Sequence, residues 1–547
     1  MSPTYDPHPP RNWRSFPTRQ AAGRLANQRY TLLKTDAATQ LPRGVCAQIV
    51  GIDASPRPMP DTQVLSELGD PLAQLVLGRG NLPMTARALL TALDVHNNDT
   101  AGLPQEDVFV AADGGNIPWT PERDEIGRQY RFVIVRRRSG EPLLMVSTGP
   151  DLDSDDVFLQ VLAWDSSRRQ FNFYMRVKPG WLWAGNSWHA FDPRCRGQGC
   201  FDSHVNGTAV MKERRLPWIH WHSAAASLDA GLSPSDPLRT EPRFIKKAGA
   251  DILQTQIMEP WVQKWTEARV DRSLAEKPGF FTRTQDLMRN VFSATTVNLV
   301  TSTVQSSLVD DDTDIDLPPG FFFNQDALFG SAGLDPTQLL VPKIKGNLYK
   351  QAARAVDLHV EDGGVRVADG DVFFAFCVPE AAFEDSQVLQ ELASREILSR
   401  RFAAATAMTD FPNPIESRDR EALLKHVPEE CQIVNGVPSL EEDIVRSIRT
   451  LVAKQPASIP EVQFLKVYDD PNWQSESLQT LAEYLVSVKT VIESPQGIVD
   501  IFRLAESRRR QFRKRKLFEF DLTVPRTSLP ADMPALKMLP TGAVVEA

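Results

Sequence analysis

The 547-residue sequence contains no stretch of 18 consecutive apolar residues, so it predicts no membrane-spanning helix. It has five cysteines, too few and too scattered for a disulfide framework. It also lacks a G-x-G-x-x-G after a predicted strand, a P-loop lysine motif and a G-x-S-x-G motif. Hydrophobic residues make up 42% of the sequence and charged residues 24%, which are the proportions of a folded globular protein.

Basic residues are outnumbered, 61 against 70 acidic ones, which gives a formal net charge of −9. An acidic chain argues against broad nucleic-acid binding, which usually needs a basic face. The N-terminus, MSPTYDPHPPRNW, has neither a basic nor an apolar leader region, so a cytoplasmic location is expected, or a periplasmic one if a leader has been lost. We expect a protein or redox partner; the sequence does not define an oligomeric state.

The length predicts more than one domain. Residues 1–60 hold nine prolines and are expected to form an extended segment. Residues 61–235 are expected to form a β-rich domain. Within it, the period-two segments 130–137, 143–147, 157–164 and 171–177 are joined by short loops, which favours an antiparallel sheet.

Helical periodicity dominates the rest of the chain, residues 236–547. Helices are predicted at 248–269, 284–309, 385–405, 440–454 and 476–491. A β-hairpin insertion is predicted near 356–378, where Gly363-Gly364 resembles a tight turn. The predicted fold class is therefore α+β, with an antiparallel β-rich N-terminal half and a mostly α-helical C-terminal half.

The segment 181–222 has an unusual composition. Four of the eight histidines lie in it, with two of the five cysteines and five of the eleven tryptophans. Imidazole and thiolate are the side chains that bind transition metals and haem iron, and an indole-rich shell lowers the dielectric constant around such a centre. This segment is the strongest functional signal in the sequence.

Inside it, Cys200-Phe201-Asp202-Ser203-His204 resembles the C-x-x-C-H haem-attachment motif of c-type cytochromes, with Ser203 in place of the second cysteine. The following residues, V-N-G, are similar to those of uncharacterised bacterial proteins with an intact C-x-x-C-H-V-N-G. The resemblance covers roughly 40 residues and implies a haem attached through Cys200, with His204 as axial ligand. The opposite ligand would be Met211 or one of His189, His220 and His222.

A non-haem transition-metal ion is the second interpretation. The ligands available for it are Cys195, Cys200, His204, His220 and His222. On a strand, His220 and His222 would project from the same face, as two ligands of one metal must.

The third interpretation is that these residues pack and hydrogen-bond within a sheet and bind no cofactor. The sequence therefore leads to two functional hypotheses. One is a haem- or metal-dependent redox protein, of the oxidoreductase class if it is an enzyme, with a centre built from residues 181–222. The alternative is a non-catalytic scaffold or binding protein with a degenerate cofactor site. The basic run at 508–516 is expected to be a solvated helix face.

Overall fold

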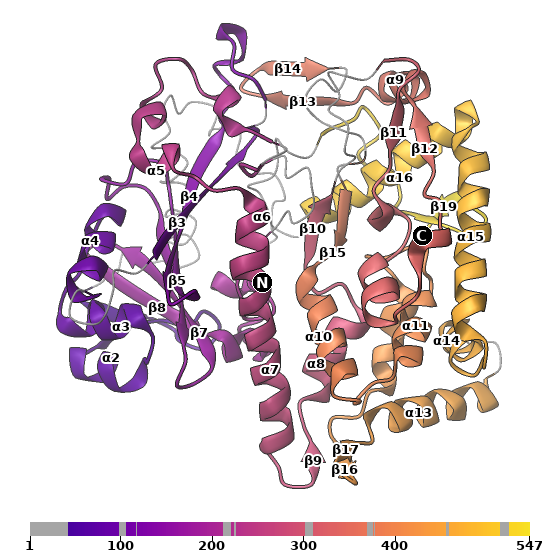
Figure 1. Cartoon of the computed structure of the whole chain (residues 1–547), viewed down its shortest axis with the longest axis horizontal. Coiled ribbons are helices and arrows are strands. Elements are labelled where there is room, and N and C mark those ends of the chain that lie inside the picture. The colour runs from indigo at the N-terminus through magenta and orange to yellow at the C-terminus, as the bar shows by residue number, and fades with distance from the viewer. Residues whose placement is uncertain are drawn as a thin grey trace.

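The described residues fold into two parts (Figure 1), each built around a large hydrophobic core. The computed structural model describes residues 42–97, 105–115, 117–211, 220–223, 226–300, 310–368, 376, 378–455, 459–514 and 525–547. Buried side chains of the first core come from residues between Val45 and Ala268, and those of the second mainly from residues between Val270 and Met538. We call the two parts the N-terminal lobe and the C-terminal lobe.

An eight-stranded sheet forms the centre of the N-terminal lobe, in the order β2–β1–β8–β7–β6–β5–β4–β3. Its strands are β1 (Val45–Ala47), β2 (Arg57–Met59), β3 (Gln105–Asp113), β4 (Gln129–Arg138), β5 (Glu141–Thr148), β6 (Leu159–Asp165), β7 (Gln170–Val177) and β8 (Gly180–Asn186). Neighbouring strands are antiparallel except β1 and β8, which run parallel with Val45 opposite Trp181. The four period-two segments of the sequence correspond to β4, β5, β6 and β7.

In the described residues before β3 there are three α-helices: α2 (Asp61–Glu67), α3 (Pro71–Leu75) and α4 (Ala86–Asn97). Asp70 separates the first two. Its carboxylate caps α3 by accepting from the backbone N–H groups of Leu72 and Ala73, and Pro71 takes the first helical position, where no N–H is needed. α3 packs on β5 and β6.

The two lobes share one long helix, α7 (Glu259–Ala275). It follows α5 (Pro242–Ile245), α6 (Ala250–Leu253) and one π-helical turn at Gln254–Met258. Near its start, the Trp261 ring lies edge-on to Phe171 of β7 in the first core. Trp265 still belongs to the first core, whereas Val270, five residues later, belongs to the second. Segment 236–268 therefore packs with the sheet, and the change of core falls inside α7.

Helices build most of the C-terminal lobe. They are α8 (Thr284–Phe292), α9 (Gly346–Ala355), α10 (Phe383–Ser394), α11 (Arg400–Met408), α12 (Arg418–Glu421), α13 (Leu440–Lys454), α14 (Ile459–Tyr468), α15 (Trp473–Ile492) and α16 (Pro495–Arg513). Short paired strands connect them: β9 (Phe280–Phe281) with β16 (Cys431–Val434) and β17 (Val437–Pro438), β10 (Val297–Val300) with β15 (Val378–Ala381), β11 (Asp314–Asp316) with β12 (Lys343–Lys345), β13 (His359–Asp362) with β14 (Val365–Ala368), and β18 (Leu536–Met538) with β19 (Val544–Glu546).

Two of the predicted helices are interrupted. The helix predicted at 284–309 ends at Phe292, because the β-branched run from Thr295 leads into β10, which pairs with β15. The helix predicted at 385–405 is split into α10 and α11 by a turn in which Glu396 has a φ of 58°. Ser399 then starts α11 by accepting from the backbone N–H of Phe402.

The α+β prediction is confirmed: the N-terminal half holds the large, mainly antiparallel sheet and the C-terminal half is mostly helical. The hairpin β13–β14 lies within the range 356–378, with Gly363 and Gly364 at its turn. Most of the proline-rich segment predicted at 1–60 lies outside the described residues. Among the residues that are described, no helix is both long and apolar enough to cross a membrane.

Candidate functional site

The first part of the 181–222 segment folds against strands β7 and β8. After β8 the chain forms two short 3-10 turns, at Ser187–Phe191 and Gly199–Asp202. The side chain of Asn186 caps the first turn, and Nδ1 of His189 accepts from the backbone N–H of Asn186 at 3.0 Å. The second turn brings the Cys200 thiol to 3.7 Å from the carbonyl oxygen of Ala184, to which it donates.

His204 lies in the same region. Its ring centroid is 5.0 Å from that of Phe173 on β7, and its Nδ1 is 2.8 Å from the carbonyl oxygen of Thr208. A carbonyl can only accept, so Nδ1 carries the proton and donates it. With the proton on Nδ1, Nε2 is the ring nitrogen that can accept a hydrogen bond or bind a metal in the neutral form of the imidazole.

His220 and His222 lie at the opposite end of the sheet order. The backbone N–H of Ala112 donates to the carbonyl of His220 at 2.7 Å, and the backbone N–H of His222 donates to Val110 at 2.9 Å, so this segment extends the sheet beyond β3. Four strands, β7 to β4, separate β3 from β8. With strands about 4.8 Å apart, that is about 24 Å along the sheet. The structure therefore brings Cys200 and His204 together but separates them from His220 and His222 in the sheet.

Cys195 and Met211 are buried in the first core. Burial raises the pKa of the Cys195 thiol to about 11, and burial also raises the pKa of the Cys200 thiol. Both are thus thiols at neutral pH, whereas the thiolate is the metal-binding form. Burial lowers the pKa of His189 and of His222, so both imidazoles are neutral at pH 7.

The described part of the chain includes all five predicted metal ligands. There, no three His, Cys, Asp or Glu side chains lie together in a way that could hold a metal ion. The haem and metal assignments therefore stay predictions.

The tryptophans at the start of the segment bond within the fold. Nε1 of Trp181 donates to the carbonyl of Pro83 at 2.9 Å, and Nε1 of Trp183 donates to Oδ1 of Asn172 at 3.1 Å. Asn172 in turn donates from Nδ2 to Oδ2 of Asp70 at 2.8 Å, and the Tyr174 hydroxyl donates to the same oxygen at 2.5 Å. Trp183 is thereby linked through β7 to the start of α3.

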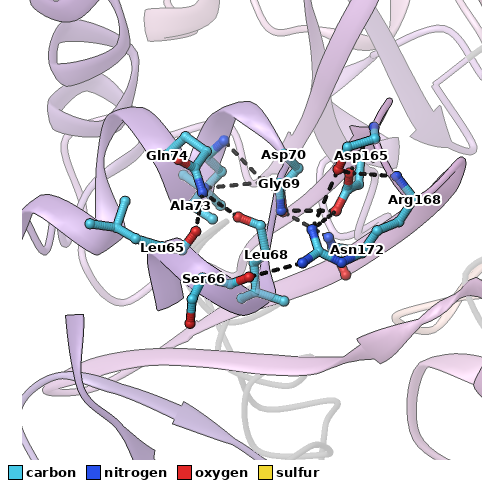
Figure 2. Close-up of polar contacts among 12 residues, drawn as sticks. Leu65, Ser66, Leu68, Gly69, Asp70, Ala73, Gln74, Asp165, Arg168 and Asn172 are labelled. Carbon is cyan, nitrogen blue, oxygen red and sulfur yellow. Dashed lines mark hydrogen bonds and ion pairs between the residues drawn. The ribbon is translucent and has the colours of Figure 1, made fainter. Parts of the chain in front are cut away.

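Asp165 provides a second link between the α2–α3 pair and the sheet (Figure 2). Its carboxylate accepts from the backbone N–H of Gly69 at 2.8 Å and from the backbone N–H and guanidinium of Arg168. Arg168 also donates to the carbonyl of Ser66. Burial raises the pKa of Asp165, but the donors on Ser167, Gly69 and Arg168 outweigh it, and the pKa is lowered overall. Asp70 and Asp165 together fasten α2 and α3 to β6 and β7.

A third polar cluster joins the two lobes. Asn206, which follows the C-F-D-S-H motif, accepts at Oδ1 from Nδ2 of Asn290 at 3.1 Å and donates from Nδ2 to Oγ1 of Thr295 at 2.8 Å. Asn290 and Thr295 both donate to Asp385 of α10. We call these four residues the seam cluster.

Sequence reasoning did not select the two buried acids Asp70 and Asp385. Asp70-Pro71 carried a local signal, since an Asp before a Pro is a common helix start. The local sequence around Asp385 gives no such signal, because its hydrogen-bond partners are 90 or more residues away in the chain.

Comparisons with known proteins give no further guide: no protein family, curated protein or solved structure matches this chain.

Proposed function

We propose that this chain is a non-catalytic scaffold or binding protein in which the 181–222 segment serves the fold. One observation carries the proposal: four of the tryptophan and histidine side chains in the described part of this segment before residue 212 are bonded to the protein's own groups. Trp181, Trp183, His189 and His204 each bond to a neighbouring backbone or side-chain group. Such internal bonding is what a segment needs when its aromatic and imidazole side chains fill a half-buried surface.

Asn206 supports the same proposal, because it links the segment to the C-terminal lobe. A side chain that ties two lobes together has a role in the fold itself. We propose a protein as the partner and the cytoplasm as the location; the formal net charge of −9 argues against nucleic acid as the partner.

The second candidate function is a haem- or metal-dependent redox protein, and His204 favours it. Metal-bound histidines commonly donate their other ring N–H to a carbonyl or carboxylate, as Nδ1 of His204 does toward Thr208. Cys200 would supply the attachment point. Its thiol is turned onto the Ala184 carbonyl, so attachment requires the 199–204 turn to move. A bound haem would supply electron-transfer chemistry.

An absorption spectrum and an elemental analysis distinguish the two functions. Protein made with an ample supply of haem, iron and zinc is expected to show a 280 nm band alone and no stoichiometric metal. A Soret band with one equivalent of iron, or one equivalent of another metal, would overturn the scaffold proposal in favour of the second candidate.

Replacing His204 tests its role directly. For a structural histidine, we expect His204→Ala to lower the free energy of unfolding by about 1–3 kcal/mol, because the Thr208 carbonyl loses its donor. His204→Asn is the matched control, since its amide can still donate to that carbonyl, and it should recover part of the loss. Thermal unfolding of the three proteins measures this. A metal or haem content that falls in both variants would instead identify His204 as a ligand.

Restoring the second cysteine tests the haem resemblance. If the motif is a decayed attachment site, Ser203→Cys should bind haem covalently when the chain is exported and matured with a cytochrome c assembly system. Haem that stays with the protein in acidified organic solvent is the expected readout. The matched control is Ser203→Cys with Cys200→Ala, which again leaves one cysteine. Haem that extracts fully from Ser203→Cys would contradict the resemblance.

A further inference from the structure

A serine, a histidine and a glutamate form a chain of hydrogen bonds in the C-terminal lobe. Oγ of Ser447 on α13 is 2.9 Å from Nδ1 of His426, which ends the 3-10 turn at Ala422–His426. Nε2 of the same imidazole is 3.0 Å from Oε1 of Glu461, in the first turn of α14. The turn packs against both helices, and the helices pack against each other (Figure 1). Three packed elements thus hold the three side chains together.

The partners of the imidazole fix the direction of both hydrogen bonds. Glu461 is 0% exposed and also pairs with Nζ of Lys425 at 2.6 Å, so its carboxylate acts as an acceptor. Nε2 of His426 therefore carries the proton and donates it, and in the neutral imidazole Nδ1 is then the acceptor. The Ser447 hydroxyl donates to that Nδ1. A base lies at the hydroxyl, and a carboxylate holds the base in the tautomer that can take up a proton.

This contact distinguishes Ser447 from other hydroxyl residues inside helices. Thr450 on α13, and Ser487 and Thr490 on α15, each donate to the carbonyl four residues earlier in their own helix, at 2.7, 3.0 and 3.1 Å. Bonding back to the own helix is common for an interior serine or threonine. Ser447 is partly exposed and bonds to His426 instead. It is therefore a serine that solvent reaches and that already contacts a base.

A nucleophile, a base and an orienting acid within hydrogen-bond distance are the arrangement that activates a serine for acyl transfer. We infer that Ser447 is a covalent modification site, whose hydroxyl takes the acyl group of an activated ester with His426 as general base and Glu461 as the positioning residue. A group held on Ser447 is a modification and not a catalytic turnover. The inference goes beyond the scaffold function and does not depend on it.

The reaction needs no cofactor. Oγ of Ser447 forms a bond to the acyl carbon, and the bond between that carbon and the leaving oxygen breaks. The hydroxyl proton passes to Nδ1 of His426 and from there to the leaving group or to water. The products are a serine ester and a free alcohol or phenol, and nothing is oxidised or reduced.

The place of Ser447 in α13 limits which compounds can react. It lies in the helix interior, where backbone N–H groups bond to carbonyls of the same helix. Those N–H groups cannot supply the oxyanion hole that speeds the reaction of ordinary esters and amides. We therefore expect reaction with strongly activated acyl or phosphonyl compounds, and slow hydrolysis of the serine ester, so that the group stays on the protein.

A fluorophosphonate is the probe for this site, because it forms a bond between Oγ and phosphorus and releases fluoride. The folded full chain is treated with excess probe, and mass spectrometry of the intact protein and of its peptides locates the label. We expect one equivalent, on Ser447. Ser487 is the matched internal control and should stay unlabelled: it is also a partly exposed serine inside a helix, but it donates to the Glu483 carbonyl. Treatment in concentrated guanidinium chloride should abolish the label on Ser447.

Two variants test the roles of the residues. Ser447→Ala should take up no probe, whereas Ser487→Ala should react as the wild type does. His426→Gln keeps a side chain that can both donate and accept but removes the base. Its labelling should slow by about 10²–10⁴-fold, the usual contribution of a general base. Thermal unfolding of each variant shows whether the fold is kept.

The proposal is overturned if the folded wild type takes up no probe at Ser447, or if that labelling continues unchanged in guanidinium chloride. It is also overturned if a folded His426→Gln protein reacts at the wild-type rate. Should His426→Gln not fold, the comparison of folded with denatured wild type decides alone, since only the folded chain brings His426 to Ser447.

Discussion

Replacing Asp70 with alanine is expected to lower the free energy of unfolding of the N-terminal lobe by about 3–5 kcal/mol. The side chain is 0% exposed and accepts four hydrogen bonds, two from the start of α3 and one each from Asn172 and Tyr174. Loss of the cap costs about 1 kcal/mol. Each buried donor left without an acceptor adds about 1–3 kcal/mol.

Thermal unfolding followed by tryptophan fluorescence should show this as a lower melting temperature for the N-terminal lobe, by about 6–20 °C for a lobe of this size. Asp61→Ala is the matched control, because Asp61 is an exposed acid at the start of α2, and it should change the free energy of unfolding by less than about 0.5 kcal/mol. Similar losses in the two variants would contradict the assigned role of Asp70.

A double-mutant cycle identifies the mechanism. Tyr174→Phe removes one donor and should cost about 1–3 kcal/mol alone. Combined with Asp70→Ala it should cost much less than the sum, since the tyrosine hydroxyl has then already lost its partner. Additive effects would mean that the contact between Asp70 and Tyr174 contributes little.

The sequence allowed the central sheet to be predicted in part. The strands at 129–177 alternate apolar and polar residues and follow one another through short turns, so local pattern and pairing agree. The parallel pairing of β1 with β8 was not predictable in this way. It joins Val45 to Trp181 across 136 residues, and nothing in either short strand specifies the other.

The candidate site shows the limit of clustering along a sequence. Four histidines within 34 residues suggested one centre, but the chain crosses from β8 to the β3 edge between His204 and His220. Cys200 and His204 lie close together because one turn contains both, whereas His204 and His220 lie on different parts of the sheet. The seam cluster shows the converse, because Asn206 and Asp385 come together from positions 179 residues apart.

The basic run at 508–516 shows how a buried partner changes the interpretation of a charge pattern. The described part of this run does not form the predicted solvated face. Arg509 is 1% exposed, and Glu506, one turn earlier on α16, is 2% exposed. Glu506 accepts from Arg509 at 2.8 Å and from Arg510 at 2.8 Å, and pairs with Arg513 at 3.7 Å. One buried carboxylate thus forms ion pairs with three arginine side chains.

We therefore expect Glu506→Gln to lower the free energy of unfolding of the C-terminal lobe by about 3–5 kcal/mol at pH 7.5, because it leaves the buried guanidinium of Arg509 without its carboxylate. Burial raises the pKa of Glu506, but the arginines outweigh it and the pKa is lowered overall. A lowered pKa means stability that is present above the unfolded value, about pH 4.3, and lost as pH falls below it.

The difference between wild type and Glu506→Gln should accordingly shrink as pH falls below about 4.3, where the unfolded chain binds a proton at Glu506 more readily than the folded one does. Melting temperatures at pH 7.5, 5, 4 and 3 measure it. Glu493→Gln is the matched control, since Glu493 meets Lys489 at 3.9 Å with both side chains about two-thirds exposed, and such a pair contributes about 0–1 kcal/mol. A deficit in Glu506→Gln that stays constant with pH would show that the packing of Glu506, and not its charge, holds the arginines in place.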